Sequence, residues 1–193
     1  MDKEQILAKA FETSTFSTEE MKKMSELFEF VAFEKGDYIL TQNSIANNLT
    51  IVLDGLLRSF AIDPDGNEIT TNFHGKGAGV LEVASFFLRV PTKENTQALS
   101  NGKGLKISFE GFQELFHSIS KFREAARARL VNGFFSLKNR NLSMITDSAE
   151  ERYLQLIKTH PQVISEAPLK YIASYLGITD TSLSRIRREL SKK

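Results

Sequence analysis

Residues 169–190 have the sequence LKYIASYLGITDTSLSRIRREL, and their pattern predicts two short helices that cross at a sharp angle. Such a crossing needs a small residue where the helices touch and a residue that tolerates positive φ at the corner. Ala173 and Gly177 stand at these two places. The other fixed positions of the pattern hold aliphatic side chains: Ile172, Leu176, Ile178, Leu183 and Ile186. The stretch therefore predicts a helix-turn-helix.

The second of these helices has different residue types on its two faces. Leu183, Ile186 and Leu190 recur at helical spacing, and we expect them to point inward. Short hydroxyl side chains and arginines occupy the opposite face. Such hydroxyl groups can approach phosphates and bases closely, and Arg185 could bind guanine through two hydrogen bonds. The predicted residues for binding double-stranded DNA are Lys170, Thr179, Thr181, Ser182, Arg185 and Arg188.

Residues near the ends of the second helix add a helix cap and further charges. Thr179 stands where a side chain can cap the helix N-terminus. Arg187, Lys192 and Lys193, together with Lys170, are candidates for phosphate contacts, which fix the position on DNA without reading its sequence. Asp180 would repel a phosphate, but it would favour the positive end of the helix or accept a hydrogen bond from a cytosine amine.

The charge distribution along the chain agrees with this assignment. The whole chain has 25 Lys and Arg against 24 Asp and Glu. Residues 151–193 hold 8 basic and 4 acidic side chains, whereas residues 1–150 hold 17 and 20. A basic C-terminal unit on a mildly acidic body predicts a polyanionic partner for that end. Charge alone leaves open a solvated helix whose basic tail favours the negative end of its dipole.

Residues 30–109 have the pattern of short strands separated by tight turns. Runs of β-prone residues alternate there with glycine, asparagine and aspartate. Residues 63–67, Asp-Pro-Asp-Gly-Asn, are a turn signal that joins 56–62 to 68–73 as a hairpin. Many short strands at such intervals predict an antiparallel barrel or roll. Apolar residues at helical spacing over 2–30 predict short helices in front of it.

Residues 110–146 return to a helical period. The stretch from about Phe122 to Met144 has no proline and predicts one long helix of about 33 Å. Along one side of this helix, from Ala126 to Met144, successive positions are spaced alternately four and three residues apart. This is the spacing of residues that face the partner helix in a coiled coil. Such an apolar helix is too long for one small domain to cover, so we predict that it pairs with a second copy; lying on the roll is the alternative. The predicted dimer-helix residues are Ala126, Leu130, Gly133, Phe134, Leu137 and Met144.

The order of these parts, with front helices, roll, long helix and basic helix-turn-helix, resembles the Crp/Fnr family of bacterial transcription regulators. The resemblance extends from about residue 25 to the C-terminus. It implies an α+β chain with a cyclic-nucleotide-binding-like jelly roll in 1–146, including a dimerisation helix at about 120–146. It also implies a winged-helix DNA-binding domain in 147–193. Since only three residues follow the second helix of the pair, we expect the wing to be short or absent.

The residues that hold cyclic AMP in this family are altered here. In members that bind it, a Gly-Glu pair holds the ribose and an Arg-Ser pair holds the cyclic phosphate. The resemblance places Glu82 at the ribose, but it places Glu94 and Asn95 at the phosphate. A carboxylate facing a phosphate in a partly buried pocket is unfavourable, so we predict no cyclic AMP binding and assign no cofactor. The candidate pocket residues are Glu82, Lys93, Asn95, Thr96, Leu137 and Lys138, the last two standing where the family's long helix contacts adenine.

Composition argues against several other classes of protein. The chain has no cysteine, which excludes a disulfide scaffold and a thiolate metal site, and its three histidines share no ligand spacing, so we predict no metal site. No Ser-His-Asp or paired-carboxylate arrangement indicates an enzyme. Neither a signal peptide nor a membrane span is evident, which predicts a cytoplasmic protein without a membrane partner.

These observations predict a dimeric DNA-binding transcription regulator, not an enzyme, that recognises a pseudo-palindromic site. The resemblance makes RNA polymerase a candidate partner in addition to DNA. The alternative is a jelly roll that binds a small molecule and whose C-terminal helices mediate protein contacts.

Overall fold

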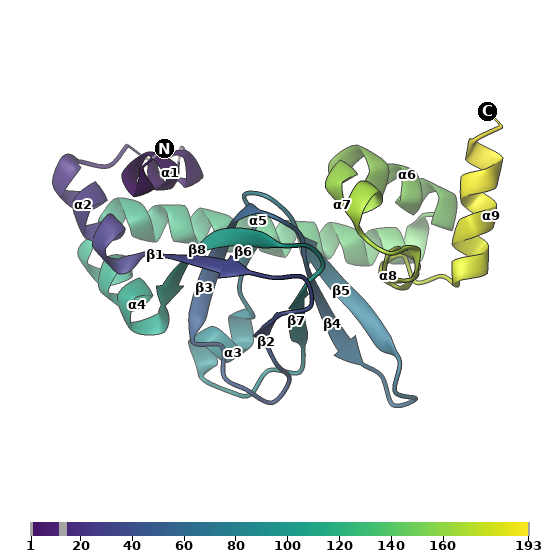
Figure 1. Ribbon diagram of the computed structural model, residues 1–193, viewed down its shortest axis with the longest axis horizontal. Helices are drawn as coiled ribbons and strands as arrows, with labels where there is room; N and C mark the ends of the chain where they lie inside the picture. The colour runs from purple at the N-terminus through teal and green to yellow at the C-terminus, as the bar shows by residue number, and fades with distance from the viewer. Residues whose placement is uncertain (1, 12–14, 193) are drawn as a thin grey trace.

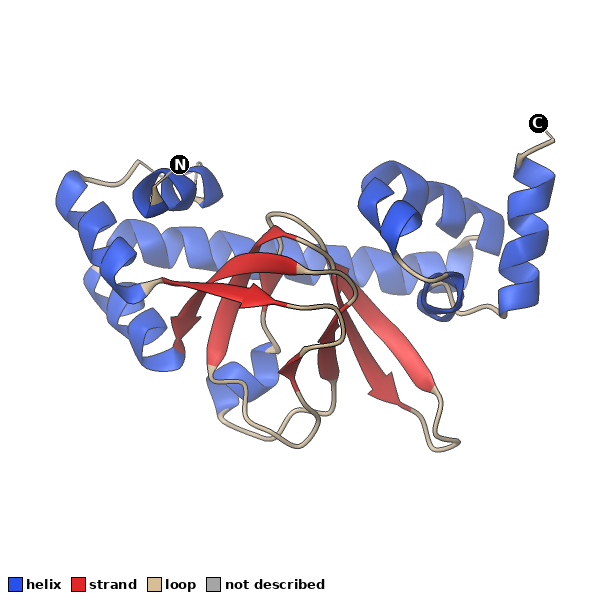
Figure 2. Cartoon of the chain, viewed as in Figure 1, coloured by secondary structure: helices blue, strands red, loops and turns tan. Residues whose placement is uncertain are grey.

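The structure is a computed structural model that describes residues 2–11 and 15–192. A β-roll lies beside one long helix, and a group of short helices packs at the far end of that helix (Figure 1). Figure 2 shows the strands gathered in the roll and helices at both ends of the molecule. The two chain termini lie on opposite halves of the molecule. This arrangement places the roll and the C-terminal helices on a shared helical support.

The two predicted helices at the front of the chain are present. They are α1 (Lys3–Ala10) and α2 (Thr18–Leu27). Each begins with a capping box, in which the Asp2 or Ser17 side chain accepts from a backbone N–H while Gln5 or Glu20 bonds back to the cap. These reciprocal bonds explain where both helices start.

The predicted antiparallel roll is confirmed. It consists of two four-stranded sheets, with strand orders β1-β8-β3-β6 and β2-β7-β4-β5. Every strand pairing is antiparallel. The strands are β1 (Glu29–Phe33), β2 (Tyr38–Leu40), β3 (Asn48–Asp54), β4 (Leu57–Ile62), β5 (Glu68–His74), β6 (Gly79–Val80), β7 (Asn95–Ala98) and β8 (Gly102–Ser108).

The hairpin of β4 and β5 turns where the sequence predicts. The Asp63 carboxylate accepts hydrogen bonds from the backbone N–H groups of Asp65 and Asn67. Gly66 closes the turn with φ of 85°, a conformation that favours glycine. Figure 1 shows this hairpin extending beyond the rest of the roll, below the C-terminal helices.

An aromatic core joins the roll to the front helices. Helices α3 (Val83–Leu88) and α4 (Phe109–Ser118) supply Phe86 and Phe112, whose rings are 5.5 Å apart between centroids. Phe122, at the start of the long helix, is buried and contacts Phe112. These edge-to-face ring contacts anchor one end of the long helix.

The long helix α5 (Ser120–Thr146) has 27 residues, close to the predicted 120–146. Its first two turns bury Phe122, Ala125 and Ala126 in the aromatic core. From 127 to 139 every residue is exposed. The helix therefore leaves the aromatic core after about two turns. Arg129 still donates to the Ala10 carbonyl and lies over the Phe11 ring, but the apolar side chains beyond it are exposed.

Four helices form the C-terminal unit. Ser148 begins the first with a capping box to Glu151, and Pro161 stands in the first turn of the second, where its missing N–H costs nothing. The helices are α6 (Ala149–Thr159), α7 (Pro161–Glu166), α8 (Leu169–Tyr175) and α9 (Asp180–Leu190).

Arg58 on β4 connects the roll to this unit. Its side chain is fully buried, and it donates to the Glu68 carboxylate at 2.6 Å and to the Thr70 hydroxyl at 2.9 Å. The guanidinium carbon lies 4.3 Å from the centroid of the Phe60 ring and 3.6 Å from that of Tyr171. Since Tyr171 belongs to α8, a buried cation bridges the two parts of the chain.

Further contacts extend this joint. The Ser174 hydroxyl on α8 accepts from the Thr70 N–H at 2.9 Å and donates to the Glu68 carbonyl at 3.3 Å. Leu56 and Phe73 of the roll belong to the same buried cluster as the core residues of the C-terminal helices. The roll and the C-terminal unit therefore share one hydrophobic core.

Because Arg58 forms this joint, replacing it should reduce the stability of the protein more than replacing any other arginine. We expect Arg58→Ala to lower the free energy of unfolding by about 3 kcal/mol, because it removes a buried charge with its ring and carboxylate partners. Arg127→Ala is the matched control, since Arg127 pairs with Glu124 on the surface and should contribute less than about 1 kcal/mol. Urea denaturation followed by circular dichroism measures both. Equal losses in the two variants would contradict the role of Arg58.

Candidate functional site

The helix-turn-helix has the geometry that its residues require. Gly177 has φ of 67° at the corner between α8 and α9. Ala173 is buried where the two helices pack, as are Leu183 and Ile186 on the inner side of α9. The Thr179 side chain accepts from the Ser182 N–H at 3.3 Å and so caps α9, as predicted. The predicted helix pair is thus present.

The end of α5 supports the corner of this motif. A Cβ added at Gly177 would lie 2.6 Å from the terminal methyl of Met144, which would have to move, and the positive φ of this residue also disfavours any side chain. Arg140 donates to the Tyr175 carbonyl at 3.0 Å and lies over the Tyr175 ring. The helix-turn-helix is therefore held by α5 on one side and by β5 on the other.

The outer face of α9 presents the predicted DNA-binding residues together. Thr179, Thr181, Arg185 and Arg188 are exposed, Ser182 is half-buried, and Lys170 is exposed on α8. Neither Arg185 nor Arg188 forms a side-chain hydrogen bond or ion pair with any described residue. An exposed pair of guanidinium groups without partners is available to an anionic ligand.

The start of α9 is a cluster of hydroxyl groups. The Thr179 hydroxyl lies 2.9 Å from that of Thr181 and 3.0 Å from that of Ser182. Asp180 is exposed in the same first turn, where a carboxylate favours the helix dipole. Arg187 and Lys192 are exposed near the other end of the helix, and Lys193 lies outside the described residues. Basic charge is therefore concentrated in the second half of α9.

The predicted dimer seam along α5 is covered at its start and exposed farther along the helix. Ala126 is 7% exposed and packs in the aromatic core of its own chain, and Met144 contacts Gly177. Between them, Leu130, Phe134 and Leu137 are 37%, 65% and 56% exposed. A Cβ added at Gly133 would meet no atom within 4 Å. The seam is therefore open to a second copy from Leu130 to Leu137, and Met144 at its end is 40% exposed as well.

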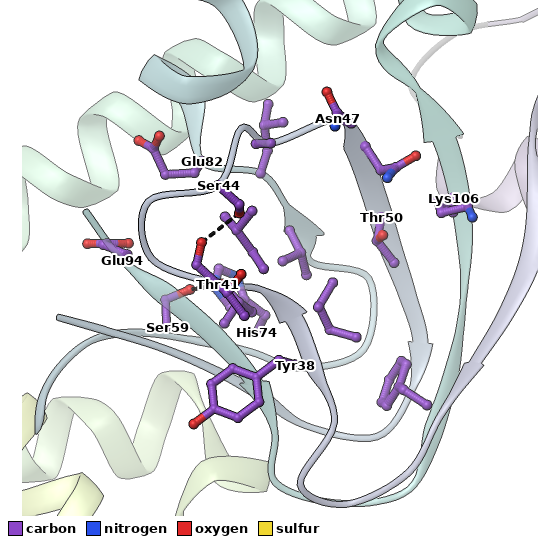
Figure 3. A pocket seen from close by; sticks show the side chains of 18 of the residues that line it. Tyr38, Thr41, Ser44, Asn47, Thr50, Ser59, His74, Glu82, Glu94 and Lys106 are labelled. Atoms are coloured by element: carbon purple, nitrogen blue, oxygen red, sulfur yellow. Dashed lines mark hydrogen bonds between the residues drawn. The ribbon is translucent and has the colours of Figure 1, made fainter. Parts of the chain in front are cut away.

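A cavity of about 550 Å³ lies within the roll (Figure 3). Glu82 and Thr96 of the predicted pocket residues line it, and Glu94 lines it beside them. The Glu82 carboxylate accepts from the backbone N–H groups of Ala84 and Ser85 and so caps α3. This cavity is where the sequence placed a ligand pocket, but its lining differs in part.

The other four predicted pocket residues do not line this cavity. Lys93 is exposed, while Asn95 is buried and accepts from the Gln42 N–H at 2.8 Å with its side-chain oxygen. Leu137 and Lys138 are exposed on the middle of α5, beyond the cavity lining. The long helix of this single chain therefore adds no side chain to the cavity wall at these two positions.

Sequence reasoning missed a polar group inside the cavity. The Ser59 hydroxyl lies 2.8 Å from His74 Nε2 and 2.9 Å from the Thr96 hydroxyl. Burial lowers the pKa of His74 to about 4, so its imidazole is neutral near pH 7. These residues come from β4, β5 and β7, and only the sheet brings them together.

The described residues contain no group of three His, Asp or Glu side chains arranged to hold a metal ion. Among the helices that the structure describes, none is long and apolar enough to cross a bilayer.

Comparison with known proteins identifies the fold. Residues 30–118 match the family model for the cyclic nucleotide-binding domain. FixK2 from Bradyrhizobium japonicum is similar with a TM-score of 0.74 at 17% identity, covering 86% of this chain and 85% of its own. CLP, a c-di-GMP responsive global regulator from Xanthomonas campestris, gives a TM-score of 0.71 at 14% identity, with 91% and 92% covered.

A Crp/Fnr family protein from Eubacterium rectale gives a TM-score of 0.71 at 16% identity, with 91% of this chain and 84% of its own covered. None of the curated protein sequences matches the chain. The predicted fold class is confirmed, because the family model matches the roll and the likeness to these structures extends over 86% or more of this chain.

The buried imidazole predicts a specific loss of stability in acid. Because His74 has a pKa of about 4 when folded and about 6.5 when unfolded, its contribution is complete above pH 6.5 and is lost as the pH falls toward 4. The loss should reach about 3 kcal/mol. We expect His74→Gln, which can still bond Ser59, to lose less stability than the wild type between about pH 7 and about pH 4.5. Urea midpoints at the two pH values test this, and identical pH dependence in both proteins would contradict it.

Proposed function

We propose that this chain, which has the fold of the Crp/Fnr family of transcription regulators, is a dimeric DNA-binding regulator that inserts α9 into the major groove. The supporting observation is the exposed pair Arg185 and Arg188, whose side chains bond no described residue, on a helix whose inner face is held by the buried Leu183 and Ile186. A rigid helix that presents arginines and hydroxyl groups suits direct contact with base edges.

The charge of the helix fits the same role. Arg187 lies between the two arginines in the sequence and Lys192 follows the helix, and both are exposed. Their position toward the end of α9 suits phosphate contacts, which orient the helix without selecting a sequence. Glu189 is the acidic neighbour in this half of the helix, so cationic side chains dominate there.

The middle of α5 supports dimerisation. Phe134 and Phe135 are 65% and 54% exposed, and their rings contact each other edge to face. Leu130, Val131 and Leu137 add further exposed apolar surface within two turns. We propose that α5 of a second copy packs against this surface. The residues have coiled-coil spacing, and in a two-fold dimer each helix presents the same face to the other. Two copies of α9 would then face successive major grooves about 34 Å apart.

Contacts between the roll and α8 would transmit regulation. Arg58 and Ser174 hold α8 against β5, and Arg140 holds its C-terminal end against α5. A change in the roll that moved β4 or β5 would therefore change the orientation of the helix-turn-helix around residues 146–148. Any effector would act by favouring one of these orientations.

The DNA contacts can be separated by their effect on selectivity. We expect Arg185→Ala to reduce the preference for a selected duplex over a random one by about tenfold or more, since a bidentate base contact contributes about 1–3 kcal/mol of discrimination. Lys192→Ala should weaken binding to both duplexes alike and reduce the salt dependence. Fluorescence anisotropy measures both, on duplexes that the wild-type chain selects from a random pool.

Lys22→Ala is the control for that experiment, because Lys22 is exposed on α2, far along the chain from α9. Unchanged binding of Arg185→Ala and Lys192→Ala to every duplex would refute the placement of α9. No binding by the wild type at low salt would favour a protein-contact role for the C-terminal helices.

Introducing charged residues into the exposed middle of α5 tests whether the chain forms this dimer. The double variant Phe134→Asp, Leu137→Asp should be monomeric, because it would bring four carboxylates to the paired face. Ile62→Asp, which alters a 48% exposed residue at the end of β4, should remain dimeric. Light scattering coupled to size exclusion gives the mass. A monomeric wild type, or a double variant that stays dimeric, would contradict the pairing.

A further inference from the structure

The lining of the roll cavity is acidic. It contains three carboxylates, Asp37, Glu82 and Glu94, and one lysine, Lys106. That lysine already faces Glu29 on β1 at 3.7 Å. His74 adds no charge near neutral pH, because burial keeps its imidazole unprotonated. A ligand inside the roll therefore meets a net negative wall.

Two of these carboxylates lie on one side of the cavity, as Figure 3 shows for Glu82 and Glu94. Neither of them forms an ion pair with any described residue. Burial raises the pKa of Glu94, and the neighbouring charge of Glu82 raises it further. A cation placed between these groups would relieve their repulsion, whereas an anion would increase it.

The arginines nearest to this region have other partners. Arg58 on β4 extends toward α8 and is bound to Glu68. Arg89 donates to the Ala46 carbonyl and the Asn47 side chain, and lies over the Phe109 ring. Arg140 is close enough to lower the pKa of Glu94, but it donates to the Tyr175 carbonyl. None of the three lines the cavity, so the wall offers no guanidinium to an anionic ligand.

Hydroxyl groups complete the lining. Thr50 is 3% exposed and lines the cavity, and its hydroxyl has no hydrogen-bond partner among the described residues. It alternates along β3 with Ile51, which packs in the aromatic core, so Thr50 faces the space between the two sheets. The hydroxyl oxygen is not among the buried side-chain atoms that lack a partner, so it is accessible from the cavity, where a ligand or water can bond it. Ser44 and Ser59 add hydroxyl groups to the same wall.

We propose that this cavity binds a small molecule bearing a protonated amine together with hydroxyl groups, with Glu94 and Glu82 facing the amine and Thr50 bonding a hydroxyl. The volume of about 550 Å³ is within the range of sites for small molecules and exceeds that of a single sugar ring. The chemistry of the wall thus favours an amino sugar or amino alcohol over a cyclic nucleotide. The site lies wholly in the roll and does not depend on DNA binding.

Calorimetry on the full chain tests the ligand class with matched pairs of probes. The amines are glucosamine and galactosamine, their neutral controls are glucose and galactose, and cyclic AMP is the anion. We expect at least one amino sugar to bind about tenfold or more tightly than its neutral partner. We expect no heat from cyclic AMP. Cyclic AMP binding more tightly than both amino sugars, or no amine preference in either pair, would overturn the proposal.

Variants of the cavity residues then test which side chain binds the amine and which binds a hydroxyl group. Glu94→Gln keeps the shape of the side chain, and it should reduce the amino sugar affinity to that of the neutral sugar. Glu26→Gln removes an exposed charge on α2 and should change nothing. Thr50→Val should weaken the amino sugar and its neutral partner by the same factor. Equal melting temperatures of the variants establish folding, and an unchanged amine preference in Glu94→Gln would refute the role of that carboxylate.

Discussion

The structure depends on a helix that its own chain cannot cover. Helix α5 is about 40 Å long, but the aromatic core around Phe122 covers only its first two turns. At the other end, Arg140 and Met144 contact the helix-turn-helix. The exposed segment 127–139 between these anchors includes two phenylalanines and two leucines. Pairing of this segment would both bury the apolar surface and set the distance between two DNA-binding units.

Acidic and basic side chains gather in different parts of the molecule. The roll encloses Glu82 and Glu94 in an acidic cavity, while Arg185 and Arg188 lie on the exposed face of α9. Arg58 joins the two regions, since Ser59 beside it lines the cavity while the Arg58 guanidinium lies over Tyr171 on α8. One strand, β4, is thus in contact with both the ligand space and the helix-turn-helix. A ligand that shifted β4 would act on α8 through Arg58 and through the contacts of the paired strand β5 with Ser174.

Local sequence signals predicted the local structure well. Gly177 and Ala173 defined the helix-turn-helix because the corner takes a positive φ and the crossing buries Ala173, and residues 63–67 defined the hairpin because Asp63 bonds its own turn. Contacts between distant segments were not accessible in this way. Ala126 has seam spacing, yet it packs in its own core, because α4 and the front helices lie against that turn. Lys93 and Asn95 are next to Glu94 in sequence, but Lys93 and Glu94 lie in the loop before β7 whereas Asn95 begins the strand, and the three differ in burial.

Two paired copies of this chain should place their two α9 helices in successive major grooves of DNA. Hydroxyl-radical footprinting of the wild-type chain on a selected duplex measures this directly, because it maps protection along both strands. We expect two protected regions related by two-fold symmetry and separated by one helical turn, about 10 base pairs. A single protected region, or two regions without a fixed spacing, would contradict the account.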